Sequence, residues 1–365
     1  MVCGFDYRTE ATTRHMPQPQ PITATLPFDE SFDDIIDVRS ESEFAEDRLP
    51  GSINLPLLND SQRVEVGTDY KQVGGFEAKR SGAVLIMANI SRHLAEHFAD
   101  KPKSYRPLIY CWRGGQRSQS LAVVLAAIGW RTHILDGGYK TYRRHILDQL
   151  EILPAQFRWI AINGLTGSAK TRVLHHLAEQ GEQILDLEGL ANHKGSVLGL
   201  DPDNPQPSQK LFESRIHHAL AGMDASRPVF VEAESKKVGN VHCPEAVWKA
   251  MTGSTVFRIE AERMARVQFL LEDYGHFLKN PDLLQERIHL LRERYGQAQI
   301  EHWEAQIAGA DWPAFVDSIL EVHYDPSYKS SVRYPKATEV FTTDTLDADG
   351  QSALARNMAR AVTEL

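Results

Sequence analysis

Residues 110–120 read YCWRGGQRSQS and combine one cysteine with two glycines and two arginines. An apolar run precedes Cys111 and a helix-like segment follows, so we expect the cysteine at the carboxyl end of a parallel strand, where α/β sheets bind ligands. The glycines allow the backbone to turn its N–H groups inward as an anion-binding nest, and the arginines and helix dipole stabilise a thiolate. The loop therefore predicts Cys111 as a nucleophile that faces an anion. The predicted anion-binding residues are Trp112, Arg113, Gly114, Gly115, Gln116, Arg117 and Ser118.

A second loop, GLTGSAKT at residues 164–171, follows a strand-like run and precedes a helix-like run, which is the context of the phosphate-binding motif G-x-x-x-x-G-K-[ST]. Lys170 is expected to reach phosphate oxygens, and Thr171 to ligate Mg²⁺ or hold the anion. Alanine replaces the second glycine of the motif and adds one methyl group. A Walker-B candidate, Glu232 with Glu234, lacks the usual aspartate, so turnover of ATP or GTP is not assumed. The predicted phosphate- or diphosphate-binding residues are Gly164, Leu165, Thr166, Gly167, Ser168, Ala169, Lys170 and Thr171.

The composition is that of a globular protein with room for two ordinary domains. The net charge of −9 over 365 residues excludes a wholly basic nucleic-acid binder but not a local basic face. The longest apolar run, residues 121–130, is too short to cross a bilayer, and the N-terminus lacks the apolar segment of a secretory signal. The cysteines Cys3, Cys111 and Cys243 form no CxxC pair, and His242 has no further ligands at metal-binding spacing. We therefore expect a cytoplasmic protein without a disulfide framework or a cysteine–histidine metal site.

Strand-like and helix-like segments alternate along the chain, which predicts parallel sheets in two α/β domains. The polar, proline-rich residues 1–28 are expected to form an arm. Residues 29–150 are the first predicted domain, and residues 151–365 the second, with a boundary near Pro154 and a mostly helical C-terminal part. A long helix is expected at residues 80–98. Strands are expected at residues 33–39, 107–111, 131–138, 157–163, 183–188, 228–235 and 254–260.

The first predicted domain resembles a rhodanese domain in DDIIDVRSESEFAEDRLPGSINLP (residues 33–56) and YCWRGGQRS (residues 110–118). The resemblance covers residues 29–148 and implies that Cys111 carries sulfur or selenium as a persulfide or perselenide. The spacing Cys-x5-Arg followed by Ser118 is also that of cysteine phosphatases, some of which share this fold. Chalcogen transfer and phosphate-ester hydrolysis therefore both stay open at this point. A phosphatase also needs a general acid, and the sequence does not identify one.

Nearly the whole chain after the arm resembles the tRNA 2-selenouridine synthases, in which a rhodanese domain precedes a P-loop domain. Members act on the tRNA wobble uridine that already bears 2-thiouridine and replace its sulfur with selenium from selenophosphate. They also transfer a geranyl group from geranyl diphosphate to that sulfur, and the S-geranyl nucleoside is taken as the intermediate that selenium displaces. Five stretches carry the resemblance in order, at residues 53–75, 135–144, 185–199, 207–214 and 229–241.

The resemblance implies a role for each loop. Cys111 is expected to carry selenium, with its loop binding the phosphate end of selenophosphate, and the P-loop to hold geranyl diphosphate, with Mg²⁺ as a candidate companion. The partner is expected to be the anticodon loop of a tRNA; an enzyme that supplies selenophosphate is a further candidate, no membrane partner is expected, and a monomer is favoured. Candidate residues lining the P-loop cleft are Asp186, Glu188, His193, Lys194 and Glu234. Candidate tRNA contacts, from the basic and aromatic run YKTYRRH, are Lys140, Tyr142, Arg143 and Arg144.

Two other functions are compatible with parts of the sequence. One is a rhodanese-fold cysteine phosphatase with an appended nucleotide-binding domain. The other is a non-catalytic binding module gated by a nucleotide, which fits less well because an inactive rhodanese commonly loses the cysteine that is present here as Cys111.

Overall fold

The computed structural model describes residues 20–195, 199, 204–233, 235–329 and 336–363. The chain divides into two compact units, Met1–Tyr142 and Arg143–Leu365. The division falls inside helix α5 (Gly138–Ile152), which begins in the first unit and ends in the second. Among the described residues, no helix is both long and apolar enough to cross a membrane.

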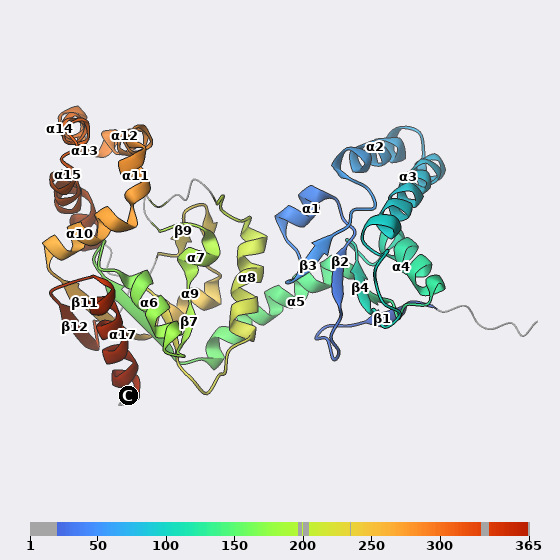
Figure 1. Cartoon of the computed structure of the whole chain (residues 1–365), viewed down its shortest axis with the longest axis horizontal. Helices are drawn as coiled ribbons and strands as arrows, with labels where there is room; N and C mark the ends of the chain where they lie inside the picture. The colour runs from blue at the N-terminus through green and yellow to red at the C-terminus, as the bar shows by residue number, and fades with distance from the viewer. Residues whose placement is uncertain (1–19, 196–198, 200–203, 234, 330–335, 364–365) are drawn as a thin grey trace, which may run out of the picture. The chain divides into compact units, whose positions relative to one another are not determined.

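The first unit contains a five-stranded parallel sheet in the order β1-β5-β4-β2-β3 (Figure 1). Its central strands are short and fully or largely buried, as expected for a parallel sheet covered by helices. Edge strand β1 lies within the range expected to be an arm, and it pairs with β5 from Ile22 to Ala24. The strands are β1 (Ile22–Ala24), β2 (Asp34–Asp37), β3 (Ser52–Asn54), β4 (Pro107–Tyr110) and β5 (His133–Leu135).

Side chains alternate across this sheet, so that Ile36 and Ile109 point to one face, while Tyr110 points to the other. The first face packs against Ile90 of α3 and Leu121 of α4, which bury a common apolar core. The helices of the first unit are α1 (Glu41–Glu46), α2 (Asp60–Gln72), α3 (Gly75–Glu96) and α4 (Gln116–Ile128).

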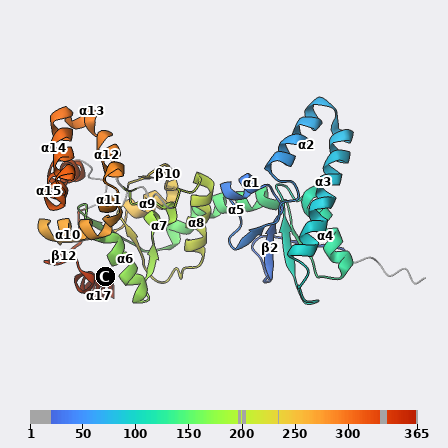
Figure 2. The ribbon, with the colours of Figure 1, turned by 45° about the horizontal axis from the view of Figure 1, so that its top comes forward.

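Helices α2 and α3 follow β3 in the sequence and precede β4. They pack side by side (Figure 2). Asn59 caps α2, because its side chain accepts a hydrogen bond from the N–H of Gln62 at 2.8 Å. The helices approach closely where Gly82 faces Val66. The sequence predicted only the second helix, since the apolar residues of α2 do not gather on one face and none is buried.

The carboxyl end of β2 carries a buried ion pair between Asp37 and Arg39, with 2.6 Å between Oδ2 and Nη2. Both side chains are fully buried. The same Nη2 donates to the backbone carbonyl of Asp47 at 2.5 Å, and the guanidinium lies 4.0 Å from the ring centroid of Tyr139. The hydroxyl of Tyr139 in turn donates to Asp47 Oδ2 at 2.8 Å. One buried charge thus links the end of β2 to the segment after α1 and to the start of α5.

The second unit is built on a parallel sheet of order β12-β11-β6-β8-β7, which confirms the α/β expectation for both halves. Helices α6 and α17 cover one face, with Val173 and Met358 in the shared core. Edge strand β12 lies in the region predicted to be mostly helical. The strands are β6 (Trp159–Gly164), β7 (Gln183–Leu185), β8 (Val229–Glu232), β11 (Thr255–Ala261) and β12 (Glu339–Thr343), beside an antiparallel pair, β9 (Lys237–Val238) and β10 (Val241–His242).

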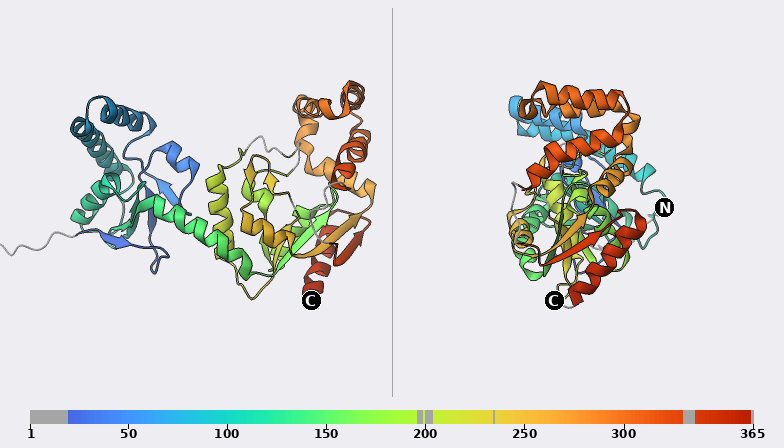
Figure 3. Two further views of the ribbon diagram at one scale, coloured as in Figure 1. Left: turned by 180° about the vertical axis from the view of Figure 1, so that it is seen from behind. Right: turned by 90° about the vertical axis from the view of Figure 1, so that its left-hand side faces the viewer.

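A group of helices follows β11 and precedes β12 in the chain (Figure 3). It has a core of its own around the fully buried Trp303. The predicted helical C-terminal part is confirmed over this group. Its members are α10 (Arg263–Asp273), α11 (Gly275–Lys279), α12 (Pro281–His289), α13 (Arg292–Tyr295), α14 (Gln297–Ala308), α15 (Trp312–Ile319), the π-helix η2 (Leu320–Tyr324) and α16 (Asp325–Lys329). The other helices of the unit are the 3-10 helix η1 (Leu153–Gln156), α6 (Lys170–Glu179), α7 (Leu187–Ala191), α8 (Gln209–Ala221), α9 (Glu245–Thr252) and α17 (Ala348–Thr363).

The substitution Arg39→Ala is expected to destabilise the first unit by about 3–5 kcal/mol, because it leaves the carboxylate of Asp37 buried and without its cation. Urea-dependent hydrogen exchange of the β2 and β4 amides measures this free energy of unfolding within the unit. The matched control is Arg80→Ala, which breaks an exposed pair with Glu77 and should cost less than about 1 kcal/mol. Equal losses for the two variants would contradict the role given to the buried pair.

Candidate functional site

Cys111 directly follows β4, and α4 begins five residues later at Gln116, with Gly115 as its N-cap. The intervening loop turns back because Gly114 has φ +65°, a conformation that glycine adopts without strain. The first N–H groups of α4 have no acceptor within the helix and point toward the loop. The predicted order of strand, glycine-containing loop and helix N-terminus is therefore present in the structure.

The sulfur of Cys111 lies inside this curl and is almost completely buried, with 3% of the residue exposed. The backbone N–H of Gly115 donates to Sγ at 3.2 Å, and Ser118 Oγ lies 3.2 Å from the same sulfur. The Ser118 hydroxyl is also within hydrogen-bond distance of the Gly115 carbonyl, at 3.1 Å. A thiolate would therefore have one fixed backbone donor and one hydroxyl that can rotate toward it.

The first residues of α5 contact the backbone of the cysteine loop and fix its position. Gly138 has φ +60°, and a Cβ at this position would collide with the carbonyl oxygen of Cys111 and the nitrogen of Gly114. The N–H of Tyr139 donates to the Cys111 carbonyl at 2.8 Å, and that of Lys140 to the Trp112 carbonyl at 3.0 Å. The loop is thus held by direct backbone contact, which only a glycine at position 138 permits.

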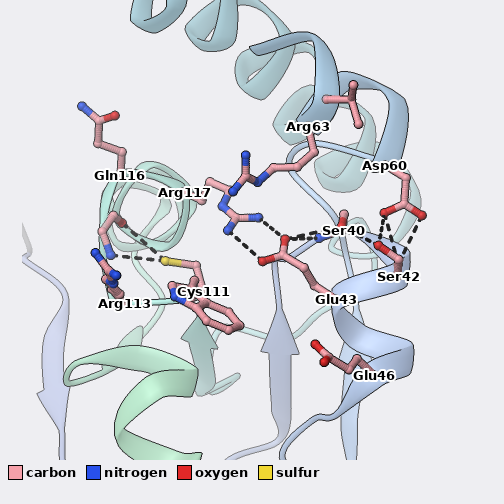
Figure 4. A pocket seen from close by; sticks show the side chains of 13 residues that line it. Ser40, Ser42, Glu43, Glu46, Asp60, Arg63, Cys111, Arg113, Gln116 and Arg117 are labelled. Atoms are coloured by element: carbon pink, nitrogen blue, oxygen red, sulfur yellow. Dashed lines mark hydrogen bonds and ion pairs between the residues drawn. The ribbon is translucent and has the colours of Figure 1, made fainter. Parts of the chain in front are cut away.

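A cleft of about 820 Å³ opens in front of Cys111 and is lined by α1, α2 and the cysteine loop (Figure 4). Its walls carry three arginines and three carboxylates in addition to the sulfur. The charged lining residues are Glu43, Glu46, Asp60, Arg63, Arg113 and Arg117, and the others are Ser40, Ser42, Val64, Cys111, Trp112, Gly115 and Gln116.

Arg117 was predicted to face an anion, and in the structure it faces the carboxylate of Glu43 (Figure 4). Its Nη1 and Nη2 lie 2.8 and 3.4 Å from the two oxygens of that carboxylate. Burial would raise the pKa of Glu43, but the hydrogen bond and charge of Arg117 outweigh it and hold the pKa below its ordinary value. The carboxylate is therefore ionised and paired, while Arg113 stays exposed at the other side of the loop.

The second predicted loop connects β6 to α6 in the second unit, as the phosphate-binding motif requires. Gly167 has φ +81°, and a Cβ there would collide with Leu270. Ala169 has φ +59° and ψ +25°, so the residue that replaces glycine in the motif adopts the left-handed conformation. This conformation costs an L-residue about 1–2 kcal/mol. The exchange of glycine for alanine therefore adds backbone strain as well as a methyl group.

The polar side chains of this loop are directed at the loop itself and at α7. Lys170 Nζ donates to the Gly164 carbonyl at 3.1 Å, and Thr171 Oγ1 donates to Glu188 Oε2 at 3.1 Å. The buried Arg266 donates to the Thr166 carbonyl at 2.9 Å and so fixes the tip of the loop to α10. Lysine, hydroxyl and carboxylate thus lie together at the N-terminus of α6, where a phosphate and a cation would bind.

The other candidate cleft residues have different surroundings. Asp186 caps α7 and lies 2.7 Å from His175 Nε2. Burial and the charge of Arg287 lower the pKa of His193. Lys194 pairs with Asp273, with 2.5 Å between Nζ and Oδ2. Glu188 contacts the P-loop through its hydrogen bond with Thr171. Glu234 lies outside the described residues.

The four candidate tRNA contacts all lie on α5 and differ in exposure. Lys140 and Arg144 are exposed and one helical turn apart. Tyr142 is buried, and its ring centroid lies 6.2 Å from that of Tyr139. Arg143 forms an ion pair with Glu213 and donates to the Lys210 carbonyl at 3.2 Å. Lys140 and Arg144 are therefore the two residues of this run that present free surface for a phosphate backbone.

Several cleft residues did not emerge from the sequence. Glu43 lies 74 positions before Arg117, and Asp60 and Arg63 belong to the unpredicted helix α2. The motif S-x-x-E at residues 40–43 was a signal for the start of α1, because Ser40 and Glu43 form a capping box. No local signal indicated that the same glutamate would reach across to Arg117.

Two family models match the chain in the order in which the units occur. A rhodanese-like domain matches residues 24–145, and a tRNA 2-selenouridine synthase AAA domain matches residues 157–282. The first unit therefore has a rhodanese-like fold, and the second has a P-loop-like α/β fold.

Curated proteins named tRNA 2-selenouridine synthase are similar over most of the chain. The protein from Alcanivorax borkumensis is 33% identical over 80% of this chain and 88% of its own length. That from Shewanella frigidimarina is 30% identical over 85% and 91%. That from Nitrosomonas europaea is 34% identical over 66% of this chain, and the match spans 63% of its own length. With a cysteine loop in a rhodanese-like unit followed by a P-loop unit, the chain belongs to the tRNA 2-selenouridine synthase family.

Proposed function

We propose that this protein modifies the wobble uridine of tRNA by converting 2-thiouridine to 2-selenouridine, with selenophosphate as the selenium source. The observation that carries the proposal is the position of Cys111 in a loop at the N-terminus of α4, at the floor of an open cleft, within a chain of this family. Relatives of similar length bear the name of this activity, which supports the assignment of substrate class. The selenophosphate itself is expected to come from a separate enzyme.

In this proposal the P-loop serves geranyl transfer, and the Cys111 loop serves selenium transfer. The P-loop holds the diphosphate of geranyl diphosphate through Lys170 and the N–H groups that begin α6, while the thiocarbonyl sulfur attacks the geranyl carbon and diphosphate leaves. Alkylation turns a poor leaving group into a good one. Water takes the phosphoryl group of selenophosphate as orthophosphate, and a disulfide, as two-electron oxidant, joins the released selenide to Cys111 as a perselenide. The perselenide then attacks C2, and geranylthiolate leaves with its electron pair. Two thiols reduce the remaining Se–S bond, which frees the cysteine and regenerates the disulfide. Thr171 and Glu188, which are hydrogen-bonded, are oxygen ligands of the kind that Mg²⁺ prefers.

The geometry of the cleft argues against Glu43 as the general acid that the phosphatase alternative requires. A general acid must be protonated and close to the leaving group. The carboxylate nearest to the loop arginine, Glu43, is ion-paired with Arg117, which holds its pKa below the ordinary value and keeps it ionised.

Cys111→Ser is expected to abolish selenation of 2-thiouridine tRNA and to leave geranylation intact, because only the selenium step uses the sulfur. Mass spectrometry of nucleosides from tRNA treated with the purified variant measures both products. The matched control is Cys243→Ala, which removes a buried thiol whose pKa burial raises to about 12 and should retain both activities. Loss of geranylation in Cys111→Ser would contradict the division of work.

Lys170→Ala is expected to lower geranyl transfer by about a hundredfold, because one donor to the developing diphosphate charge is lost. Selenation of tRNA that is already S-geranylated should remain within about twofold of wild type, because every residue that lines the Cys111 cleft belongs to the first unit. Lys249→Ala, which removes an exposed lysine from α9, is the control and should change neither rate. A geranyl transfer rate that Lys170→Ala leaves unchanged would refute the assignment of the P-loop.

The double variant Lys140→Ala/Arg144→Ala is expected to bind tRNA more weakly and with a salt dependence of log K that is shallower by about 1–2, because two phosphate contacts are lost. Titration of labelled tRNA at several salt concentrations measures both quantities. The control with equal charge change is Lys79→Ala/Arg80→Ala on the exposed surface of α3. If both variants showed the wild-type slope, α5 would not contact tRNA.

A further inference from the structure

The cleft at Cys111 is unusual for an anion site because its charges are balanced. Arg63, Arg113 and Arg117 would attract an anion, but Glu43, Glu46 and Asp60 line the same space. A site built to retain a phosphate dianion would place the arginines free of carboxylates.

Glu43 is fixed against Arg117 from two sides. Its carboxylate accepts both guanidinium contacts described above, and it also accepts from the backbone N–H of Ser40 at 3.2 Å. Both side chains of the pair are largely buried, with 20% of Glu43 and 13% of Arg117 exposed. The pair is therefore shielded from water and salt more than a surface ion pair is.

A guanidinium binds a carboxylate and a phosphate through the same planar N–H groups. An anion that enters the curl around Cys111 must therefore compete with Glu43 for Arg117, or bind without it through the loop N–H groups and Arg113. The carboxylate is attached to the protein and never diffuses away, so weakly held free anions are at a disadvantage.

We propose that Glu43 occupies Arg117 and thereby weakens the binding of inorganic phosphate to the Cys111 loop. Orthophosphate is abundant in cells and is also what remains of a phosphate-bearing donor, so a loop that retained it would block its own sulfur. When Glu43 pairs again with Arg117, it displaces the spent anion and reopens the cleft. This inference deepens the proposed function and rests on its assignment of a phosphate-bearing selenium donor to this loop.

The experiment measures how inorganic phosphate protects Cys111 from alkylation by iodoacetamide, with the Cys111 peptide quantified by mass spectrometry. In Glu43→Gln we expect half-protection at an about tenfold lower phosphate concentration than in wild type, because Arg117 is released from a charged partner. Glutamine also serves in a capping box, so α1 and the fold should be preserved. The assay contains no tRNA, so its failure and the failure of the proposed function can be told apart.

Two further variants separate the proposal from a general charge effect. Asp60→Asn removes a carboxylate from the same cleft whose contacts are to Ser42, and it should shift half-protection by less than about twofold. Glu43→Gln/Arg117→Gln should lose the whole gain of the single variant, since the freed arginine is absent. Unchanged protection in Glu43→Gln, an equal gain in Asp60→Asn, or a gain that persists without Arg117 would each overturn the proposal.

Discussion

The buried ion pair between Asp37 and Arg39 is the contact on which the geometry of the cysteine loop depends. Its guanidinium packs on the ring of Tyr139, whose N–H in turn holds the carbonyl of Cys111. A charge that is fully desolvated tolerates few alternative arrangements, because every displacement leaves it without a partner. The position of the sulfur is therefore determined by an interaction on the opposite face of the sheet from the α3–α4 core.

The two loops are held in place by different contacts. Around Cys111 the backbone is pressed against a second backbone turn at Gly138, and side-chain charges of both signs surround the opening. In the second unit the loop is fixed at its tip by Arg266, and its lysine rests on the Gly164 carbonyl. In the function that we propose, the first arrangement makes transient contact with a small anion, and the second holds a diphosphate.

Much of the fold and the two loops could be predicted from the sequence because their signals are local. Apolar strands followed by glycine-containing turns and helices define both loops within about ten residues. Strands β1, β3 and β12 were missed because short edge strands carry weak patterns. Helix α2 was missed because its packing against α3 leaves no buried stripe. The pairing of Glu43 with Arg117 joins positions far apart in the chain, and only the folded sheet brings them together.

The left-handed conformation of Ala169 affects how rigid the P-loop is with and without a ligand. Alanine samples this conformation less than glycine does, both before and after folding. The chain therefore loses less conformational entropy when the loop forms, but the backbone of the folded loop is more strained. The strain favours any movement that relaxes residue 169, and an anion bound to the N–H groups of α6 opposes that movement. Ligand binding would thus lower the mobility of the loop between β6 and α6. The decrease would be smaller if residue 169 were glycine.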